Sequence, residues 1–242
     1  MLWRKTRDPY RILVSEVMLQ QTQVSRVTEK YWEFLRAFPT IRALARAPLA
    51  EVLKAWSGLG YNRRAKYLHD TAKILAKKSG GQIPRDLAAL RVLPGVGEYT
   101  AGAVRMFAFN EPDTLIETNI RAAVIHHFFP HTYKTHDRVL RMYVEKAARW
   151  QDPREWHWAL MDYGVHIKKL HKNPARKSAH HVRQSRFDGS LRQVRGAILR
   201  ALSREENIND LRGRYKNKFE VAIEGLERDG LVVKRKGKWR IS

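Results

Sequence analysis

The chain has 242 residues, with 47 lysines and arginines against 24 acidic residues and a formal net charge of +23 at pH 7. It contains no cysteine, which excludes disulfides, thiolate metal sites, iron–sulfur clusters and cysteine nucleophiles. No apolar stretch approaches the length of a membrane span, and the first residues lack the apolar region of a signal peptide. So basic a chain is expected to bind a polyanion, and nucleic acid is favoured over an anionic membrane surface.

Helical periodicity dominates the first 165 residues, and strand alternation is almost absent before residue 230. Helices are predicted in chain order from Pro9 onward and over 24–38, 41–47, 49–56, 63–78, 87–93, 98–109, 119–128, 136–150 and 155–165. Proline and glycine separate them, as at Pro48 and at Gly80-Gly81. The pattern predicts an all-α core of nine or ten short helices.

One run of the chain combines two glycines with the start of a helix. Leu93-Pro94-Gly95-Val96-Gly97 precedes a helix rich in small residues. Glycine permits positive φ and a close backbone approach, and the unpaired N–H groups at a helix start can bind a phosphate. The run therefore predicts a helix-hairpin-helix, which grips a nucleic-acid backbone without reading its sequence. From the run alone, a glycine-rich turn between two core helices is an equal alternative, and the net charge favours the nucleic-acid interpretation.

The C-terminal part of the chain has a different pattern. Residues 168–187 are polar and basic and predict a linker, whose histidines fit no metal-ligand spacing. Two amphipathic helices are predicted over 192–203 and 218–228, followed by a hairpin of 231–234 and 238–241. This order predicts a winged-helix-like domain over residues 188–242. Because the hairpin is basic, DNA binding is favoured over protein contact for this domain.

Three blocks along the chain carry a family resemblance: Ser15–Val24 (SEVMLQQTQV), Gly58-Leu59-Gly60-Tyr61 and the glycine run at 93–97. Together they resemble the MutY adenine glycosylases of the HhH-GPD, or endonuclease III, superfamily. Residues 159–164 (ALMDYG) are a further match. The resemblance covers about residues 3–166 and implies a two-lobed helical core over 1–167. One lobe is expected at about 22–110, and the other is expected to combine about 1–21 with 111–167.

The resemblance implies a DNA glycosylase, which flips a base out of the duplex and hydrolyses its N-glycosidic bond. Glu16 matches the acid that protonates the leaving base, and Glu117 stands where the family has the aspartate beneath the sugar cation. Tyr99 occupies the position of the Schiff-base lysine of bifunctional relatives, so no lyase chemistry is expected. Asn119 would orient the water or the acid. From the residues alone, an exposed Glu16, a packed Tyr99 and an Asn119 that only caps local backbone remain alternatives.

The resemblance also implies DNA contacts. Gln21 would fill the space of the flipped base, Tyr61 would lie near the opposite base, and the hairpin and the basic linker would bind phosphates. The full set is Gln21, Tyr61, Leu93, Gly95, Val96, Gly97, Lys168, Lys172, Arg176 and Lys177. A surface glutamine and a solvated linker are the simpler accounts of part of this set.

The chain departs from the family at several positions. Glu117 is one methylene longer than the family's aspartate, in chemistry where about 0.5 Å of placement matters. Trp158, a predicted pocket residue, stands where the family has a side chain that contacts adenine, and an indole offers no acceptor. Asn62 replaces the second tyrosine after Gly-Leu-Gly. Lys168 stands where the first cluster cysteine would be, so no iron–sulfur cluster and no other cofactor or metal is expected. The winged-helix-like segment takes the place of the family's 8-oxoguanine-reading domain.

Three hypotheses follow. The first is a monofunctional glycosylase of base excision repair that removes a mispaired base, with adenine opposite 8-oxoguanine or guanine favoured. The second is a glycosylase for thymine or uracil opposite guanine, or for a deaminated purine. The third is a DNA-binding module without catalysis. The expected partner is double-stranded DNA with a mismatched or damaged base, and the protein is expected to be a cytoplasmic, nucleoid-associated monomer.

Overall fold

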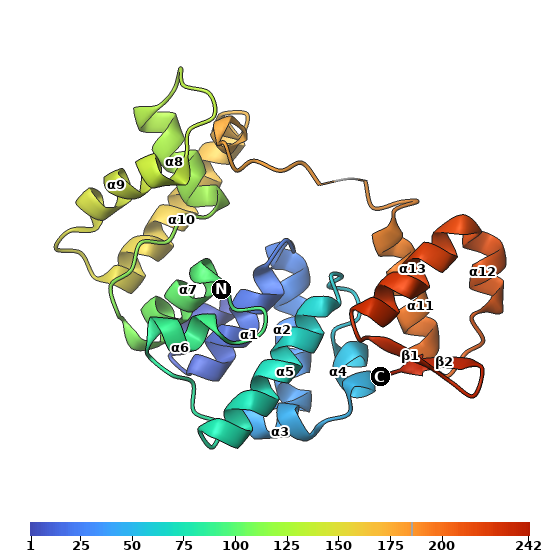
Figure 1. The fold of residues 1–242 in the computed structure, drawn as a ribbon. Helices are drawn as coiled ribbons and strands as arrows, with labels where there is room; N and C mark the ends of the chain where they lie inside the picture. Colours follow the sequence, from blue (N-terminus) through green and yellow to red (C-terminus); the bar gives the residue numbers. More distant parts are fainter. Residues whose placement is uncertain (185) are drawn as a thin grey trace.

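The structure is a computed structural model that describes residues 1–184 and 186–242. A helical core begins with five α-helices, of which α1 carries Glu16 in its interior (Figure 1). Their bounds, with that of the short 3-10 helix η1, are η1 Leu2–Lys5, α1 Pro9–Leu19, α2 Val24–Ala37, α3 Ile41–Arg46, α4 Leu49–Ala55 and α5 Arg63–Lys78. Asp8 starts α1 because its carboxylate accepts hydrogen bonds from the backbone N–H groups of Tyr10 and Arg11. The aromatic rings of Phe34 and Trp56, both fully buried, meet edge to face in this part of the core.

The hairpin lies between α6 (Leu87–Arg91) and α7 (Glu98–Phe109). Helix α1 packs against α2, α5 and α7. The sequence-based division of the lobes placed residues 1–21 with 111–167, and the packing of α1 differs from it. The reason is that α1 and α7 are both apolar over most of their circumference and bury these surfaces against each other.

A second group of helices lies beyond the hairpin, at the upper left of Figure 1. It consists of α8 (Thr118–Phe128), α9 (Asp137–Ala148), α10 (Pro153–Leu170) and the 3-10 helix η2 (Pro174–Lys177). Helices α8 and α10 approach closely at Gly164, where an added Cβ would lie 2.0 Å from the carbonyl oxygen of Asn119. Glycine is therefore required at this crossing, which fixes the start of α8 against α10.

The predicted linker over 168–187 is wrong in its first half. Helix α10 continues to Leu170, so Lys168 is helical. Pro174 and Ala175 are buried against α8, and the backbone pairs Thr135 with Ser178 in a single parallel bridge. This polar, proline-containing stretch has no amphipathic periodicity. The packing of Pro174 and Ala175 against α8 could therefore not be predicted from the sequence pattern.

The C-terminal domain lies at the right of Figure 1, in orange and red. It contains α11 (Leu191–Ser203), α12 (Asn209–Tyr215), α13 (Asn217–Arg228) and the antiparallel strands β1 (Val232–Arg235) and β2 (Lys238–Ile241). Helix α12 was not predicted; it is short, none of its residues is fully buried, and only Leu211 and Tyr215 pack partly buried against the core. Helix α11 packs on α4 of the core. Asp229, which follows α13, forms an ion pair with Arg63 of the core and another with Arg195 of α11 in its own domain. The three helices and the hairpin have the order of a winged helix.

The all-α prediction is confirmed, since β1 and β2 are the only strands in the described part of the chain. Most predicted helices end within a few residues of the observed bounds, and the prediction for α5 and α7 matches at both ends. Within residues 1–184 and 186–242, no helix combines the length and the apolar character that crossing a membrane requires.

Candidate active site

A cavity of about 350 Å³ opens where α1, α7, the start of α8 and α10 meet. It brings together residues that are far apart in the sequence and that were singled out there. The predicted residues that line it are Glu16, Gln21, Tyr99, Glu117, Asn119 and Trp158. Arg4, Gln20, Phe107 and Asp162 also line it, and of these Arg4, Gln20 and Phe107 were not predicted as site residues. We call this cavity the base pocket.

Glu16 lies in the interior of α1, and only 6% of its surface is exposed. Burial, and after it the nearby charge of Glu117, raise the pKa of its carboxyl group to about 8, while Arg4 acts in the opposite direction. Glu16 therefore holds a proton at neutral pH. This position was predicted from the resemblance alone, and the alternative of an exposed helix carboxylate is wrong.

Glu117 is the N-cap of α8. Its Oε1 accepts hydrogen bonds from the backbone N–H groups of Asn119, at 2.7 Å, and of Ile120, at 2.9 Å. Burial raises its pKa, while these two bonds and the charges of Lys168 and Arg121 oppose that rise. The two carboxyl groups thus have different surroundings. Only Glu117 has donors that stabilise its ionised form, so it is the carboxylate of the pair.

Tyr99 and Asn119 complete the polar lining. The pKa of the Tyr99 hydroxyl is raised well above its usual value, first by burial and then by the charges of Glu16 and Glu117, so this hydroxyl keeps its proton. Asn119 donates from Nδ2 to Oε2 of Glu117 at 3.2 Å. Its Oδ1 is buried and has no hydrogen-bond partner among the described residues. The pocket therefore contains an acceptor that a water or a substrate N–H could satisfy.

An aromatic wall closes another side of the base pocket. The indole of Trp158 stacks on Phe107 with ring centroids 5.6 Å apart, and the guanidinium of Arg4 lies 5.5 Å from the Trp158 ring centroid. Arg4 also donates two hydrogen bonds to the carboxylate of Asp162, at 2.6 and 2.9 Å. Arg4 and Asp162 are 158 positions apart, and nothing in the sequence pattern pairs them. This pair is the part of the pocket that sequence reasoning missed.

The buried His157 connects α10 to the backbone before Glu117. Its Nδ1 lies 2.8 Å from the carbonyl oxygen of Pro153, and its Nε2 lies 3.4 Å from the backbone N–H of Leu115. A neutral ring that donates from Nδ1 and accepts at Nε2 satisfies both contacts, and burial lowers the pKa of His157 in agreement with this. The side chain thereby holds the segment that leads into Glu117.

Two loops beside the base pocket carry the predicted DNA-contacting residues Gln21 and Tyr61. Both have positive φ, +55° and +47°. The buried guanidinium of Arg64 joins the loops: it donates to the carbonyl oxygen of Met18 at 2.8 Å and to that of Gly60 at 3.0 Å. With no carboxylate partner in these contacts, burial lowers the pKa of Arg64 to about 10. Gln21 and Tyr61 are therefore held next to each other by one shared cation.

The predicted hairpin has the expected turn. Gly95 has a φ of +74°, and an added Cβ would lie 2.8 Å from Cβ of Tyr67, so only glycine fits. Gly97 is the N-cap of α7 and leaves its first N–H groups without a side-chain acceptor. The side chains of Leu93 and Val96 are buried in the core. Leu93 and Val96 therefore leave their backbone, and not their side chains, for contact with a ligand.

The predicted basic residues of the linker differ in their surroundings. Lys168 lies on α10 close enough to Glu117 to influence its pKa. Lys177 donates to the carbonyl oxygen of Pro130 and lies 5.6 Å from the Tyr133 ring centroid. Lys172 and Arg176 are exposed.

An iron–sulfur cluster does not fit this segment. The chain has no cysteine to supply thiolate ligands, and residues 174–175 are packed against α8. In the described part of the chain, no group of three or more histidine or acidic residues has the arrangement of a metal site.

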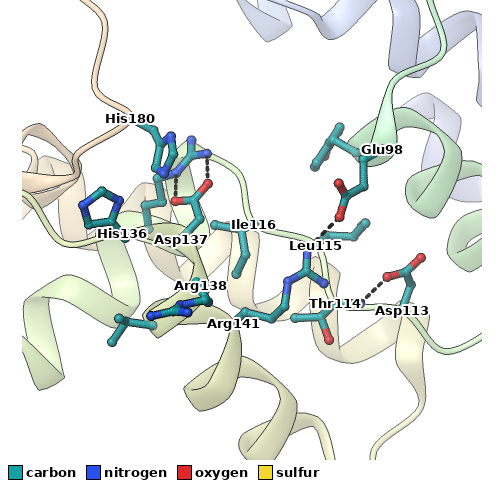
Figure 2. A pocket seen from close by; sticks show the side chains of 13 residues that line it. Glu98, Asp113, Thr114, Leu115, Ile116, His136, Asp137, Arg138, Arg141 and His180 are labelled. Atoms are coloured by element: carbon teal, nitrogen blue, oxygen red, sulfur yellow. Dashed lines mark hydrogen bonds and ion pairs between the residues drawn. The ribbon is translucent and has the colours of Figure 1, made fainter. Parts of the chain in front are cut away.

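A larger cavity, of about 770 Å³, lies between α7 and α9 (Figure 2). Its acidic residues are paired: Asp137 with Arg121 at 2.6 Å, and Glu98 with Arg141 at 3.3 Å. Tyr99 lines both this cavity and the base pocket. These carboxylates are neutralised by arginines, whereas Glu16 and Glu117 form no ion pair within the described part of the chain. The base pocket is therefore the candidate active site.

Comparisons with known proteins agree with this geometry. Residues 14–149 match the HhH-GPD superfamily base excision DNA repair proteins. The adenine DNA glycosylase of Buchnera aphidicola is 36% identical over 173 residues, which cover 71% of this chain and 49% of that protein. The thymine/uracil-DNA glycosylase of Methanothermobacter thermautotrophicus is 31% identical over 169 residues, 68% of this chain and 76% of that protein.

The chain thus spans about half the length of the adenine glycosylase that it matches. Among solved structures, a thermostable thymine-DNA glycosylase aligns with a TM-score of 0.60 and 29% identity, over 68% of this chain and 77% of that one. The family match covers more than half of the sequence and includes Glu16, the hairpin and Glu117. The chain therefore belongs to the HhH-GPD superfamily of base excision DNA repair proteins.

Proposed function

We propose that this protein is a monofunctional DNA glycosylase that removes a mispaired base, with adenine opposite 8-oxoguanine or guanine as the first candidate. One observation supports the proposal above the others. Glu16 and Glu117 share a base pocket of about 350 Å³, and their surroundings keep the first protonated and stabilise the second as a carboxylate. Cleavage of an N-glycosidic bond to a purine needs this combination of one acid and one anion.

The proposed reaction begins with a base that has left the duplex and entered the pocket. Glu16 donates its proton to a ring nitrogen of the base as the bond to the sugar breaks. The carboxylate of Glu117 then stabilises the positive charge on the sugar. A water that donates to the free Oδ1 of Asn119 adds to the sugar carbon and loses its proton to a carboxylate. Because Tyr99 offers no amine, no Schiff base forms and the strand is not cut.

The proposed DNA contacts surround this pocket. Gln21 would fill the place of the flipped base and Tyr61 would lie near the opposite base, and Arg64 holds the two loops that carry them together. The N–H groups of the hairpin at the start of α7 would bind a phosphate of the same strand. The proposed partner is mismatched or damaged duplex DNA, bound by a monomer at the nucleoid, and no cofactor takes part.

A second substrate class is favoured by one specific observation. Trp158 and the Arg4–Asp162 pair form the wall of the pocket, and the indole offers no acceptor to the amino group of adenine. A pocket walled in this way also suits thymine or uracil opposite guanine. The Methanothermobacter relative is a thymine/uracil-DNA glycosylase, whereas the Buchnera relative is an adenine DNA glycosylase.

A panel of end-labelled duplexes tests the proposal. Each duplex carries one candidate pair: adenine opposite 8-oxoguanine, adenine opposite guanine, thymine or uracil opposite guanine, or hypoxanthine. Base release is measured as strand cleavage after alkali, and omission of alkali measures lyase activity. The adenine duplexes are expected to be cleaved fastest and only after alkali. Release of thymine or uracil alone would assign the second substrate class, and release of no base would contradict a catalytic function.

A further inference from the structure

A small cavity of about 80 Å³ lies where the C-terminal domain meets the core. Its walls come from the start of α2, from the end of α4 with the loop that follows, and from α11. Three arginines line it: Arg26 on α2, and Arg192 and Arg200 on α11. We call it the junction pocket. It is separate from the base pocket, and the two share no lining residue.

The charge of the junction pocket is unbalanced. No aspartate or glutamate lines it, and neither Arg26 nor Arg200 forms an ion pair with the described chain. Arg192 donates to the hydroxyl of Tyr61 at 2.8 Å and lies 5.3 Å from the Tyr61 ring centroid. Arg26 and Arg200 thus bring two positive charges to the pocket that no carboxylate of the described chain neutralises, which favours an anion as its occupant. Their planar forks match the oxygens of a phosphate group.

The pocket also depends on missing side chains. Gly196 lies in the middle of α11, a position where glycine destabilises a helix relative to alanine. An added Cβ at this position would lie 3.5 Å from a terminal nitrogen of Arg200 and would narrow the space. Gly58 and Gly60, which form the facing wall, have φ values of +99° and +71°. Glycine on both walls keeps the arginines accessible to a small anion.

We propose that the junction pocket binds one phosphate group of the DNA backbone, so that the core and the C-terminal domain grip the duplex together. This inference rests on the proposed action on DNA. The neighbouring residue Tyr61 is a proposed duplex-contacting residue, and Arg192 links it to the pocket. A phosphate near the flipped base would thus be bound by the same arginine that holds Tyr61. Phosphate esters and free phosphate share this chemistry, and the experiment separates them.

The test compares two double variants in a Glu16→Gln background, in which bound DNA stays intact. The first combines Arg26→Gln with Arg200→Gln. The control combines Arg36→Gln with Arg228→Gln, which removes one exposed arginine from α2 and one from the C-terminal domain, both outside the pocket. Affinity for an undamaged duplex is measured between 50 and 300 mM salt. The slope of log K against log salt is expected to fall by about 0.9 in the pocket variant relative to the control, as when one phosphate is no longer neutralised.

Equal slopes in the two double variants would overturn the proposal. A second measurement identifies the source of the phosphate: the thermal midpoint of each protein in inorganic phosphate, against chloride at the same ionic strength. A phosphate-dependent rise that is absent from the pocket variant, together with equal DNA slopes, would assign the pocket to free phosphate and would also overturn the proposal. Failure of the proposed glycosylase reaction is visible separately, as absence of base release by the parent protein, and leaves the slope comparison intact.

Discussion

The base pocket and the junction pocket differ in the sign of the charged groups that line them. The base pocket buries two carboxyl groups with few cations, and burial holds one of them protonated. The junction pocket is lined by three arginines, and no carboxylate of residues 1–184 or 186–242 lines it. The base pocket keeps Glu16 protonated for the proposed reaction, and the junction pocket is suited to bind an anionic group such as a phosphate. Although the chain has a net charge of +23, its proposed reaction thus depends on two buried carboxyl groups, and its proposed DNA binding depends on basic residues nearer the surface.

This difference predicts a separation of effects. Substitutions in the base pocket should change the rate of base release from bound DNA and leave the affinity almost unchanged. Substitutions of the outer basic residues should change affinity and its salt dependence and leave the single-turnover rate almost unchanged. A variant that moves both quantities together would break the separation.

The largest effect is expected for Glu16→Gln. An amide has no proton to donate to the leaving base, so base release should fall by at least about 10³-fold while duplex binding stays close to that of the parent. Single-turnover cleavage and a binding titration on the same duplex measure the two quantities. A single-turnover rate within a few-fold of the parent would contradict the role of Glu16 as the acid.

The next largest effect is expected for Glu117→Gln, with a reduction of about 10²- to 10³-fold in rate, because a neutral amide stabilises a cation poorly. Glu117→Asp is the matched variant that keeps the charge. Since the full length of the glutamate reaches the N–H groups of Asn119 and Ile120, the shorter carboxylate should be misplaced and cost about 10- to 100-fold. A Gln variant as fast as the parent would remove Glu117 from the mechanism.

The pH dependence sharpens the assignment of the two carboxyl groups. The reaction needs Glu16 protonated, and its pKa is raised to about 8, so the single-turnover rate should fall about tenfold per pH unit above pH 8. It needs Glu117 ionised, and burial raises that pKa, so the rate should also fall on the acid side, beginning above the usual range of a glutamate. Rates from pH 5 to 10 test both limbs. An alkaline limb centred below pH 6 would contradict the raised pKa of Glu16.

The smallest effect is expected on the outer surface of the segment after α10. Lys172→Gln with Arg176→Gln should lower the salt slope by about 0.9 for each phosphate that these side chains neutralise, with an unchanged rate. Lys177→Gln is a poor probe of DNA binding because Lys177 is already bound to the carbonyl oxygen of Pro130. An unchanged slope in the double variant would leave Lys172 and Arg176 as solvated residues that do not touch DNA.

The sequence predicted the helices well because the core is built from short amphipathic helices with proline and glycine between them. Glu16, Tyr99, Glu117, Asn119 and Trp158 were predicted from the family resemblance, and the structure brings these five together in one pocket. That arrangement does not test their roles, which remain proposals. Periodicity alone would have placed Glu16 on an exposed helix face.

Other features had no local signal. The Arg4–Asp162 pair joins the two ends of the core, and a contact of this kind has no periodicity. The junction pocket depends on how α11 docks on α4, which neither segment encodes by itself. The docking of Pro174 and Ala175 on α8 was missed for a related reason, since two small apolar residues in a polar stretch are typical of a loop.

The raised pKa of Glu16 also affects the stability of the folded protein. In the unfolded chain Glu16 ionises near its ordinary pKa of 4.5, whereas in the folded protein it ionises only near pH 8. Between these values the unfolded state has released a proton that the folded state retains, so the contribution of this group to the free energy of unfolding falls as the pH rises. At neutral pH the raised pKa of Glu16 therefore lowers the free energy of unfolding, although the proposed reaction needs the proton that this pKa retains. A mutation that exposes Glu16 to solvent would lower its pKa, and the carboxyl group would lose that proton.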